Sequence, residues 1–338
     1  MRISTFFVAA LIFGDLCPVF VPDLCSPVFA EPAPGQNLGS LQAKAEQGDA
    51  DAQFNLGLMY HGGQGVTRDY AEALKWFRKA AEKGDMAAQY NLGVMFYHGE
   101  GARRDYAEAL NWYRKAAEHG HPAAQYNLGL MYHEGQGVTR DDTEAVRWWR
   151  KAAEQGRPLA QYDLGVAYHH GDGVPRDYAE AIKWYRKAAA QGDATAQYNL
   201  GRLFFLGDGV PRNAAEAAKW FRSAGDQGNA IAQRLLGVMF YQGDGVPRDD
   251  DAAAKWFRKA ADQGDAAAQH NLGVNYREGR GVPRDYVTAY MWFSLAAAQG
   301  YEPARENLDF IEPKLTTDER AQAQKMAREW RPTGPPAE

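Results

Sequence analysis

The sequence predicts an all-α solenoid of antiparallel helix pairs, arranged as seven repeats of 36 residues. Three observations lead to this prediction. Glutamine, leucine, glycine and tryptophan recur with a period of 36 residues. Each period contains two segments with apolar residues at helical spacing, and each segment lies between cap and turn residues. Because a hairpin of two short helices cannot bury both of its faces alone, we expect successive hairpins to stack.

Five positions of the repeat show the period in full. Gln53, Leu56, Gly57, Trp76 and Gly84 each have six counterparts at successive intervals of 36 residues. A glycine inside a helix, as at Gly57, costs about 1 kcal/mol relative to alanine. We therefore expect the second helix of each repeat to approach the first helix closely at this glycine, where no Cβ is in the way.

The first helix of a repeat is expected to begin after Asp49 and to run to about Tyr60. Asp49 is a favourable N-cap residue, and Ala52, Leu56 and Met59 fall on one face of the helix. Residues able to cap recur in four later repeats: Asp85, Asp193, Asn229 and Asp265. Three residues at this place depart from the pattern: His121, Arg157 and Tyr301.

A Gly-x-Gly loop, Gly63 to Gly65 in the first repeat, ends the first helix and supplies left-handed turn geometry. The second helix opens with Asp69 and Glu72, an N-cap and N3 pair related to the capping box. It carries Trp76 on a stripe of small and large residues, which suits packing rather than sugar binding. No strand precedes the glycine loops, so we interpret them as turns and not as phosphate cradles.

Residues 1–30 differ from the rest of the chain and are predicted to be a signal peptide cleaved after Ala30. Arg2 provides a short positive segment, an apolar stretch follows, and short side chains precede the cleavage site. The alternative is an uncleaved membrane anchor, although Asp15 interrupts an apolar run shorter than the ~20 residues that span a bilayer. Cleavage would remove both cysteines and place the protein in the periplasm or outside the cell.

The chain after the predicted signal peptide divides into a repeat array and its flanking segments. We expect a linker at 31–39 and, at 40–48, a partial repeat that consists of one helix equivalent to the second helix of a repeat. Seven repeats at 49–300, capping helices at 301–330 and a disordered tail at 331–338 are expected to follow. Thr316 and Glu319 form a capping box for the last helix, which runs through Trp330. Its apolar stripe is predicted to cover the last repeat.

Composition and charge exclude several classes of function. The formal net charge is -5 and the pI is about 5.9, with basic residues spread evenly, so we expect no nucleic-acid binding. The serines that follow residue 30 are Ser40, Ser223 and Ser294, and none lies in a catalytic serine motif. Histidines of neighbouring repeats would stand about 10 Å apart by ordinary helix packing, too far to converge on one metal ion. We therefore expect no enzymatic activity, no cofactor and no metal.

Two neighbouring positions near the end of the first helix vary between repeats and lie off its core stripe. The first register holds His61, Tyr97, His133, His169, Phe205, Tyr241 and Arg277. The second register holds Gly62, His98, Glu134, His170, Leu206, Gln242 and Glu278. Stacking would align them in a band rich in aromatic residues, histidine and arginine, and aromatic residues and arginine are frequent in interface hot spots. The candidate binding residues are the first register with His98, Glu134, His170 and Gln242; the alternative is a row of solvated helix ends or rim packing.

One complete repeat carries the residues by which the chain resembles a known family. It contains Ala-Gln-Tyr-Asn-Leu-Gly-Val-Met-Phe-Tyr at 88–97, a Gly-x-Gly loop, Asp-Tyr-Ala-Glu-Ala at 105–109, Trp112, and Arg-Lys-Ala-Ala-Glu at 114–118. This unit resembles the sel-one-like repeat family, a branch of the tetratricopeptide-type α-solenoids, over about residues 49–311. The resemblance implies a right-handed superhelix that serves as an adaptor. Some exported, cysteine-rich members have been linked to β-lactam binding or hydrolysis, and this chain lacks their cysteines.

These observations favour a protein–protein interaction scaffold outside the cytoplasm. We predict a monomer that binds a protein or peptide on the concave face of the solenoid, with no stable membrane insertion after cleavage and with envelope signalling as one candidate process. Two alternatives stay open at this point. One is a β-lactam-recognising hydrolase, by family analogy alone, and the other is a structural protein of the cell envelope or of peptidoglycan.

Overall fold

The computed structural model describes residues 38–333 of the chain. The predicted signal peptide, the linker as far as residue 37 and the tail from residue 334 lie outside the described residues. The described residues form seventeen α-helices and one short 3-10 helix, with no β-strand among them. Two compact units make up the chain, and the division between them falls between Thr139 and Arg140.

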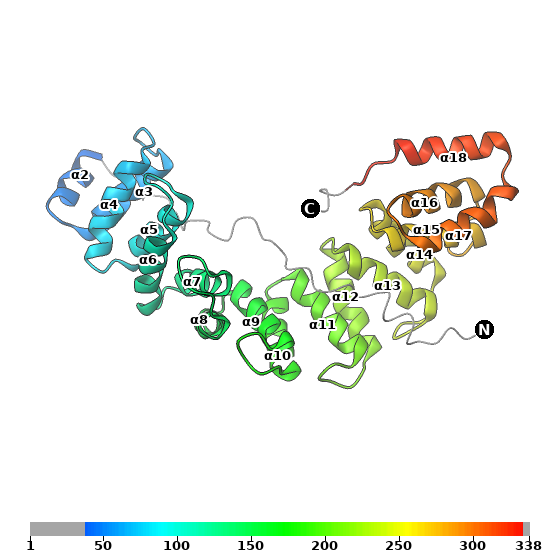
Figure 1. Ribbon diagram of the computed structural model, residues 1–338, viewed down its shortest axis with the longest axis horizontal. Coiled ribbons are helices and arrows are strands. Elements are labelled where there is room, and N and C mark those ends of the chain that lie inside the picture. The colour runs from blue at the N-terminus through cyan, green and yellow to red at the C-terminus, as the bar shows by residue number, and fades with distance from the viewer. Residues whose placement is uncertain (1–37, 334–338) are drawn as a thin grey trace. The chain divides into compact units, whose positions relative to one another are not determined.

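The first unit begins with one helix, continues with two helix pairs and ends with the first helix of a third pair (Figure 1). Its helices are α2 (Leu38–Glu46), α3 (Ala50–Gly62), α4 (Tyr70–Glu82), α5 (Met86–His98), α6 (Tyr106–Glu118) and α7 (Pro122–Glu134). Each helix packs against the next one along the chain. The first helices of the repeats are therefore α3, α5 and α7, and the second helices are α4 and α6.

The second unit continues the same pattern. Its elements are α8 (Asp142–Glu154), α9 (Pro158–His170), α10 (Tyr178–Ala190), α11 (Ala194–Leu206), α12 (Ala214–Asp226), α13 (Ala230–Gln242), α14 (Asp250–Asp262), α15 (Ala266–Glu278), α16 (Tyr286–Ala298), α17 (Glu302–Ile311), the 3-10 helix η1 (Glu312–Lys314) and α18 (Thr317–Glu329). Successive helices again pack in series, and α18 packs against α16. This serial packing of helix pairs confirms the predicted all-α solenoid.

Side-chain caps determine where most of the first helices begin. The carboxylate of Asp49 accepts a hydrogen bond from the Ala52 N–H at 2.9 Å. The same bond forms at each of the four predicted counterparts: Asp85, Asp193, Asn229 and Asp265. His121, which departs from this residue type, also caps its helix, because its Nδ1 accepts from the Ala124 N–H at 3.2 Å at the start of α7. Arg157 makes no cap bond, and proline in the first turn of the helix that follows suits a helix start without a cap.

The second helices begin with only half of the predicted reciprocal cap. Asp69 Oδ1 accepts from the backbone N–H groups of Ala71 and Glu72 at 2.9 and 3.1 Å. The Glu72 carboxylate does not return to the N-cap backbone, because it pairs with Lys75 at 2.9 Å one turn further along. Three counterparts pair in the same way: Glu144 with Arg147, Glu180 with Lys183, and Glu216 with Lys219.

The mid-helix glycines face an aromatic ring of the second helix. A Cβ added to Gly201 of α11 would lie 2.6 Å from Cδ1 and Cε1 of Phe221 in α12. Five more glycines face the equivalent ring in the same way: Gly57 with Phe77, Gly93 with Tyr113, Gly165 with Tyr185, Gly237 with Phe257, and Gly273 with Phe293. The predicted close approach is confirmed, and the ring that uses the space follows the periodic tryptophan by one residue.

The Gly-x-Gly loops serve as turns that also contact the preceding repeat. Gly63 is the left-handed C-cap of α3, with φ of 69°, and its N–H donates to the Met59 carbonyl. The second glycine of the next loop, Gly101, has φ of 71°, and a Cβ there would stand 2.3 Å from the carbonyl oxygen of Tyr70. Backbone contact this close excludes any side chain at Gly101 and confirms the predicted turn role.

A buried glutamine in each first helix bonds to the preceding second helix, and in four repeats it also accepts from the glutamine that ends the following second helix. Gln197 of α11 donates from Nε2 to the Ala189 carbonyl at the end of α10, at 3.2 Å. Its Oε1 accepts from Nε2 of Gln227, the C-cap residue of α12, at 2.8 Å. The bond to the preceding second helix recurs for Gln53, Gln89, Gln125, Gln161, Gln233 and Gln269. The carboxamide therefore satisfies a helix-end carbonyl that would otherwise be buried without a partner.

The periodic tryptophans lie in the core, which confirms that they are packing residues. Six are buried: Trp76, Trp112, Trp148, Trp184, Trp256 and Trp292. Trp220 is half-buried. In five repeats a lysine three residues later covers the indole, as where Lys115 Nζ lies 3.9 Å from the Trp112 ring centroid. This contact keeps the ammonium group solvated while its aliphatic stem covers the ring.

The C-terminal helix covers the last second helix. The capping box at its start is complete, because the Glu319 N–H donates to Thr316 Oγ1 at 3.2 Å and the Thr316 N–H donates to Glu319 Oε2 at 2.8 Å. Ala323 of α18 is buried, and Trp330 packs edge-to-face on Trp292 with ring centroids 6.2 Å apart. Phe310 of α17 is 54% exposed. α18 therefore covers α16, whereas part of α17 stays open to solvent.

Candidate functional site

The first register occupies the penultimate position of each first helix, and its side chains lie deeper than the remainder of the predicted band. His61 and His169 are buried, with exposed fractions of 8% and 7%. The other five members are half-buried: Tyr97, His133, Phe205, Tyr241 and Arg277. The rim-packing alternative therefore describes the two buried histidines, and only the half-buried members can present part of a ring or guanidinium to a partner.

Several first-register side chains contact the loop of the following repeat. His61 Nε2 lies 2.8 Å from Oε2 of Glu100, the middle residue of the next Gly-x-Gly loop. The Tyr241 hydroxyl accepts a hydrogen bond from Arg280, which stands at the same position of a later loop. Each pair is separated by 39 residues. This offset shows that the first register helps to join neighbouring repeats.

His169 stays neutral in this environment. Burial and, to a smaller extent, the charges of His170, Arg202 and Arg176 lower the pKa of His169 to about 4. The His169 ring contacts the rings of His170 and Tyr178, with centroids 4.8 and 5.4 Å apart. At pH 7 the imidazole therefore packs as an uncharged ring and brings no positive charge to the band.

Arg277 belongs to the junction with the C-terminal cap. Its guanidinium donates to Oδ1 of Asn307 in α17 and pairs with Glu278 at 2.5 Å. The same guanidinium lies 5.5 Å from the Phe310 ring centroid. Arg277 therefore ties α15 to α17, and the contact with Phe310 keeps one face of that exposed ring covered.

The second register is the accessible part of the band. His98 and Glu134 are exposed in the first unit, and His170 and Gln242 are exposed in the second unit. The His98 ring stands edge-to-face against Tyr97, with centroids 5.2 Å apart. Glu134 lines a small cavity of about 40 Å³ together with Tyr97 and other residues of α5 to α7. In the first unit the two registers therefore lie side by side, with exposed polar side chains of the second register beside half-buried rings of the first register.

A row of arginines that the sequence analysis did not single out lies beside the first register. One precedes each second helix, and we call them the loop arginines: Arg68, Arg104, Arg140, Arg176, Arg212, Arg248 and Arg284. All seven are exposed. Their recurrence every 36 residues was the available signal, but it could not show what the side chains contact.

In three repeats the loop arginine is part of a three-layer stack. The Arg68 guanidinium lies 5.3 Å from the Tyr70 ring centroid, and the Tyr70 ring meets the His61 ring edge-to-face at 4.9 Å. The second repeat builds the same stack from Arg104, Tyr106 and Tyr97, and the fourth repeat builds it from Arg176, Tyr178 and His169. The stack joins the loop arginine to the predicted band.

Where the middle ring is missing, the arginine lies directly over the first register. Ala214 replaces the tyrosine in the fifth repeat, and the Arg212 guanidinium lies 5.3 Å from the Phe205 ring centroid. In the sixth repeat Arg248 lies 5.8 Å from the Tyr241 ring centroid. A guanidinium on an aromatic face is held in a defined plane, and its N–H donors at the edge of that plane can still form hydrogen bonds.

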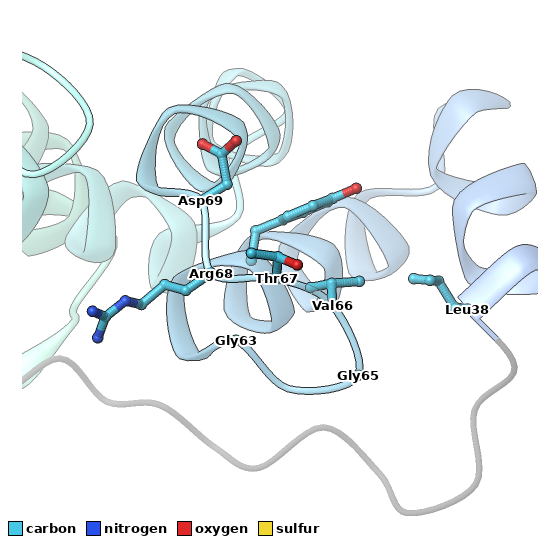
Figure 2. Close-up of a pocket in the computed structure, with 8 residues that line it drawn as sticks. Leu38, Gly63, Gly65, Val66, Thr67, Arg68 and Asp69 are labelled. Atoms are coloured by element: carbon cyan, nitrogen blue, oxygen red, sulfur yellow. The ribbon is translucent and has the colours of Figure 1, made fainter.

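An open pocket of about 820 Å³ lies at the start of the first unit. Leu38, Tyr60 and Val66 line it together with the loop that ends in Arg68 and Asp69. Figure 2 shows Val66 directed towards Leu38, and Arg68 extended from the loop away from Leu38. The pocket therefore combines an apolar wall with a guanidinium at its margin.

Residues 38–333 contain neither a cluster of metal ligands nor a helix able to span a membrane. Between residues 38 and 333 no group of three or more histidine, cysteine, aspartate or glutamate side chains is placed to hold a metal ion. Over the same residues, no helix has the length and apolar character that a membrane crossing requires. The chemistry of the described surface is thus that of aromatic rings, guanidinium groups and exposed polar tips.

One solved structure shares this architecture, and two further proteins are similar to this chain in sequence. A crystal structure of a Sel1 repeat protein from Oxalobacter formigenes is 34% identical, with a TM-score of 0.63, and the match covers 90% of this chain and 99% of that one. A protective antigen present in uropathogenic Escherichia coli strains, which displays an SLR fold, is 33% identical over 86% of this chain and 85% of that one, with a TM-score of 0.35. The secretory immunoglobulin A-binding protein EsiB from Escherichia coli is 48% identical over 44 residues, which are 13% of this chain and 9% of that relative.

Serial helix pairs with a 36-residue period define a repeat protein of the α-solenoid class. The chain belongs to the Sel1 repeat family, whose repeats match residues 50–85, 87–121, 122–156, 158–193, 194–229, 230–265 and 266–301. This membership confirms the resemblance found in the sequence. Sel1 repeat proteins are in general protein–protein interaction scaffolds, and their fold is of a non-enzymatic scaffold type.

Proposed function

We propose that this protein is an exported adaptor that binds a protein or peptide through the band at the ends of its first helices, on the concave face of the solenoid. The observation that carries the proposal is the arrangement in the first unit. Exposed His98 and Glu134 stand beside Tyr97, which is half-buried and therefore held in one place. A fixed aromatic ring with a polar rim is the arrangement common at interface hot spots.

The second unit supports the same proposal with different residues. His170 and Gln242 are exposed, and Phe205 and Tyr241 are half-buried beneath arginines. The chemical character of the band therefore changes from repeat to repeat, while the residues that hold the helices together stay the same. Variation confined to an accessible surface is what a scaffold needs in order to select one partner.

The proposed location is the periplasm or the cell exterior, with the protein acting as a monomer. Support comes from the sequence of residues 1–30, which lies outside the described residues. N-terminal sequencing of protein recovered from the periplasmic fraction would locate the cleavage site, which we place after Ala30. An intact N-terminus in the membrane fraction would instead favour the anchor.

The binding role is tested by cross-linking in the periplasmic fraction followed by mass spectrometry. Tyr97→Ala with Tyr241→Ala should weaken capture of the partner while helical content, measured by circular dichroism, stays unchanged. His98→Ala with Glu134→Ala tests the exposed register without touching a packed ring.

The matched control for these variants is Glu118→Ala with Glu154→Ala, which alters exposed residues at the ends of second helices. Equal capture by all of these proteins would exclude the band as the binding surface. Capture of peptidoglycan fragments alone would favour a structural role in the envelope. Robust turnover of nitrocefin by the purified protein would show that it is an enzyme.

A further inference from the structure

Beyond the band itself, the loop arginines differ from one another in whether the chain supplies them with a carboxylate. Arg140 pairs with Asp142 through Nη2 at 2.8 Å, and Arg248 binds both carboxylate oxygens of Asp250 at 3.2 and 3.0 Å. These two aspartates occupy the place that a tyrosine has in four other repeats. The protein itself therefore shows that a carboxylate fits the edge of a loop guanidinium.

The fifth repeat reaches the same result with a different acid. Arg212 lies over the Phe205 ring and pairs with Asp244 of the following loop at 2.5 Å. The guanidinium thus combines a stacked face with a carboxylate at its edge. Planar, bidentate pairing, as between Arg248 and Asp250, is stronger and more specific than contact with a point charge such as lysine.

In the first unit the equivalent arginines have the stacked ring but no acid. Arg68 stacks on Tyr70 and Arg104 stacks on Tyr106, and no carboxylate within residues 38–139 forms an ion pair with either guanidinium. The neighbouring Asp69 is engaged as an N-cap through two backbone N–H groups, and the same holds for its counterpart in the next repeat. Two adjacent repeats therefore present oriented, exposed guanidinium groups.

We propose that Arg68 and Arg104 form the docking edge for an acidic, extended segment of the partner protein, with two carboxylates about 10 Å apart, the spacing of neighbouring helix pairs. The inference rests on the proposed scaffold function and names the chemistry of its partner. The open pocket beside Arg68 has an apolar wall of Leu38, Tyr60 and Val66, and this wall can contact an apolar residue next to the first acid. Charge complementarity favours an anionic partner, and the chain's own Arg–Asp pairs favour carboxylates over phosphates.

The probe is a fluorescein-labelled decaglutamate peptide, and its binding to the full chain is followed by fluorescence anisotropy at low and at moderate salt. Arg68→Ala with Arg104→Ala should weaken binding about tenfold or more, because two charge-assisted contacts are lost. The matched control, Arg140→Ala with Arg248→Ala, removes the same charge from arginines that already hold an acid, and should change affinity less than about threefold.

A second pair of variants leaves both arginines in place. Tyr70→Asp with Tyr106→Asp copies the residues of the third and sixth repeats and supplies each guanidinium with its own carboxylate. It should weaken decaglutamate binding as much as the loss of the arginines does. Aspartate is also well tolerated at the start of a helix, and circular dichroism would confirm that the helices are intact.

Four results would overturn this inference. The first is the absence of saturable decaglutamate binding, and the second is an equal loss in the matched control. The third is binding of a single-stranded oligonucleotide through the same two arginines at least as tightly as decaglutamate binds, which would point to nucleic acid as the partner. Partner capture that depends on His98 and Glu134 but not on Arg68 and Arg104 would overturn the acidic docking edge while the scaffold function stands.

Discussion

Gly201 separates the effect of helix propensity from the effect of packing, because the two make opposite predictions for Gly201→Ala. Propensity alone favours alanine by about 1 kcal/mol. In the structure, however, the new Cβ would lie 2.6 Å from Cδ1 and Cε1 of Phe221 and 3.1 Å from its Cγ. Carbon atoms pack at about 3.5–4.0 Å, so the Phe221 ring or the whole of α12 would have to move by about 1 Å.

Phe221 has no room for such a movement, since its exposed fraction is 0%. Overpacking of a filled core costs about 1–3 kcal/mol, and three short contacts to one rigid ring place Gly201→Ala near the upper end of that range. Subtracting the gain in propensity leaves a net loss of about 2 kcal/mol in the free energy of unfolding.

The assay is urea unfolding followed by circular dichroism, with hydrogen exchange to locate the loss in α11 and α12, because repeat arrays can open in parts. The matched control is Gly225→Ala in α12, where the nearest side-chain atoms to a new Cβ are 3.2 Å away. Six repeats have alanine at this position: Ala81, Ala117, Ala153, Ala189, Ala261 and Ala297. We expect Gly225→Ala to be neutral or to stabilise by up to about 1 kcal/mol.

The reasoning would be refuted if Gly201→Ala were as stable as Gly225→Ala. A double-mutant cycle gives a second check. Phe221→Leu removes the ring that the new methyl group would strike, so Gly201→Ala should cost less in that background than in the natural chain. Additive losses from Gly201→Ala and Phe221→Leu would show that the two side chains do not compete for the same space.

Three further changes test the polar contacts within the core. Asn275→Leu should stabilise the protein by about 1–2 kcal/mol in urea unfolding, because Nδ2 of this residue, which is 1% exposed, has no hydrogen-bond partner; an unchanged midpoint would contradict this. Phe54→Tyr should add about 1 kcal/mol to the free energy of unfolding, because its new hydroxyl would bond to the side chain of Asn91 in the next repeat. Asn91 lies 37 residues later, is 1% exposed and has no partner for either amide atom. No gain in stability would mean that the hydroxyl does not reach Asn91. The pKa of His169 is lowered to about 4 in the folded state, so the unfolded state binds more protons and stability is lost as the pH falls from about 6.5 towards 4. His169→Tyr should flatten that dependence, and an unchanged pH profile of the urea midpoint would refute it.

The features that could be predicted from the sequence are those whose cause lies within one helix pair. Gly57 has no role as a helix former, so its recurrence pointed directly to a close contact. Asp49 stands where an N-cap is needed, and the loop glycines stand where left-handed backbone is needed. In each case the physical requirement is local, and the residue type alone identifies it.

The features that sequence reasoning missed depend on contacts between repeats. Gln53 was recognised as periodic, but its bond to a carbonyl eight residues earlier requires the position of the preceding second helix. His61 was expected in an accessible band, whereas the loop that holds Glu100 covers it from 39 residues further along. A period of 36 residues shows which residues recur and does not show the offsets at which neighbouring repeats meet.

The exceptions within the repeats become informative once these offsets are known. Lys83 stands where other repeats have glutamine or histidine, and it donates to the Gly48 carbonyl while Oε1 of Gln53 is left without a partner. The loop arginines behave differently, because a change beside them brings a new partner: Asp250 replaces the tyrosine of other repeats, and Arg248 pairs with its carboxylate while it lies over the Tyr241 ring. A guanidinium that keeps its place while its neighbour changes between a ring and an acid has a fixed geometry and an interchangeable ligand. That combination is what a docking edge requires, and it explains why arginines that have only the ring, as Arg68 and Arg104 do, are available to an acidic partner.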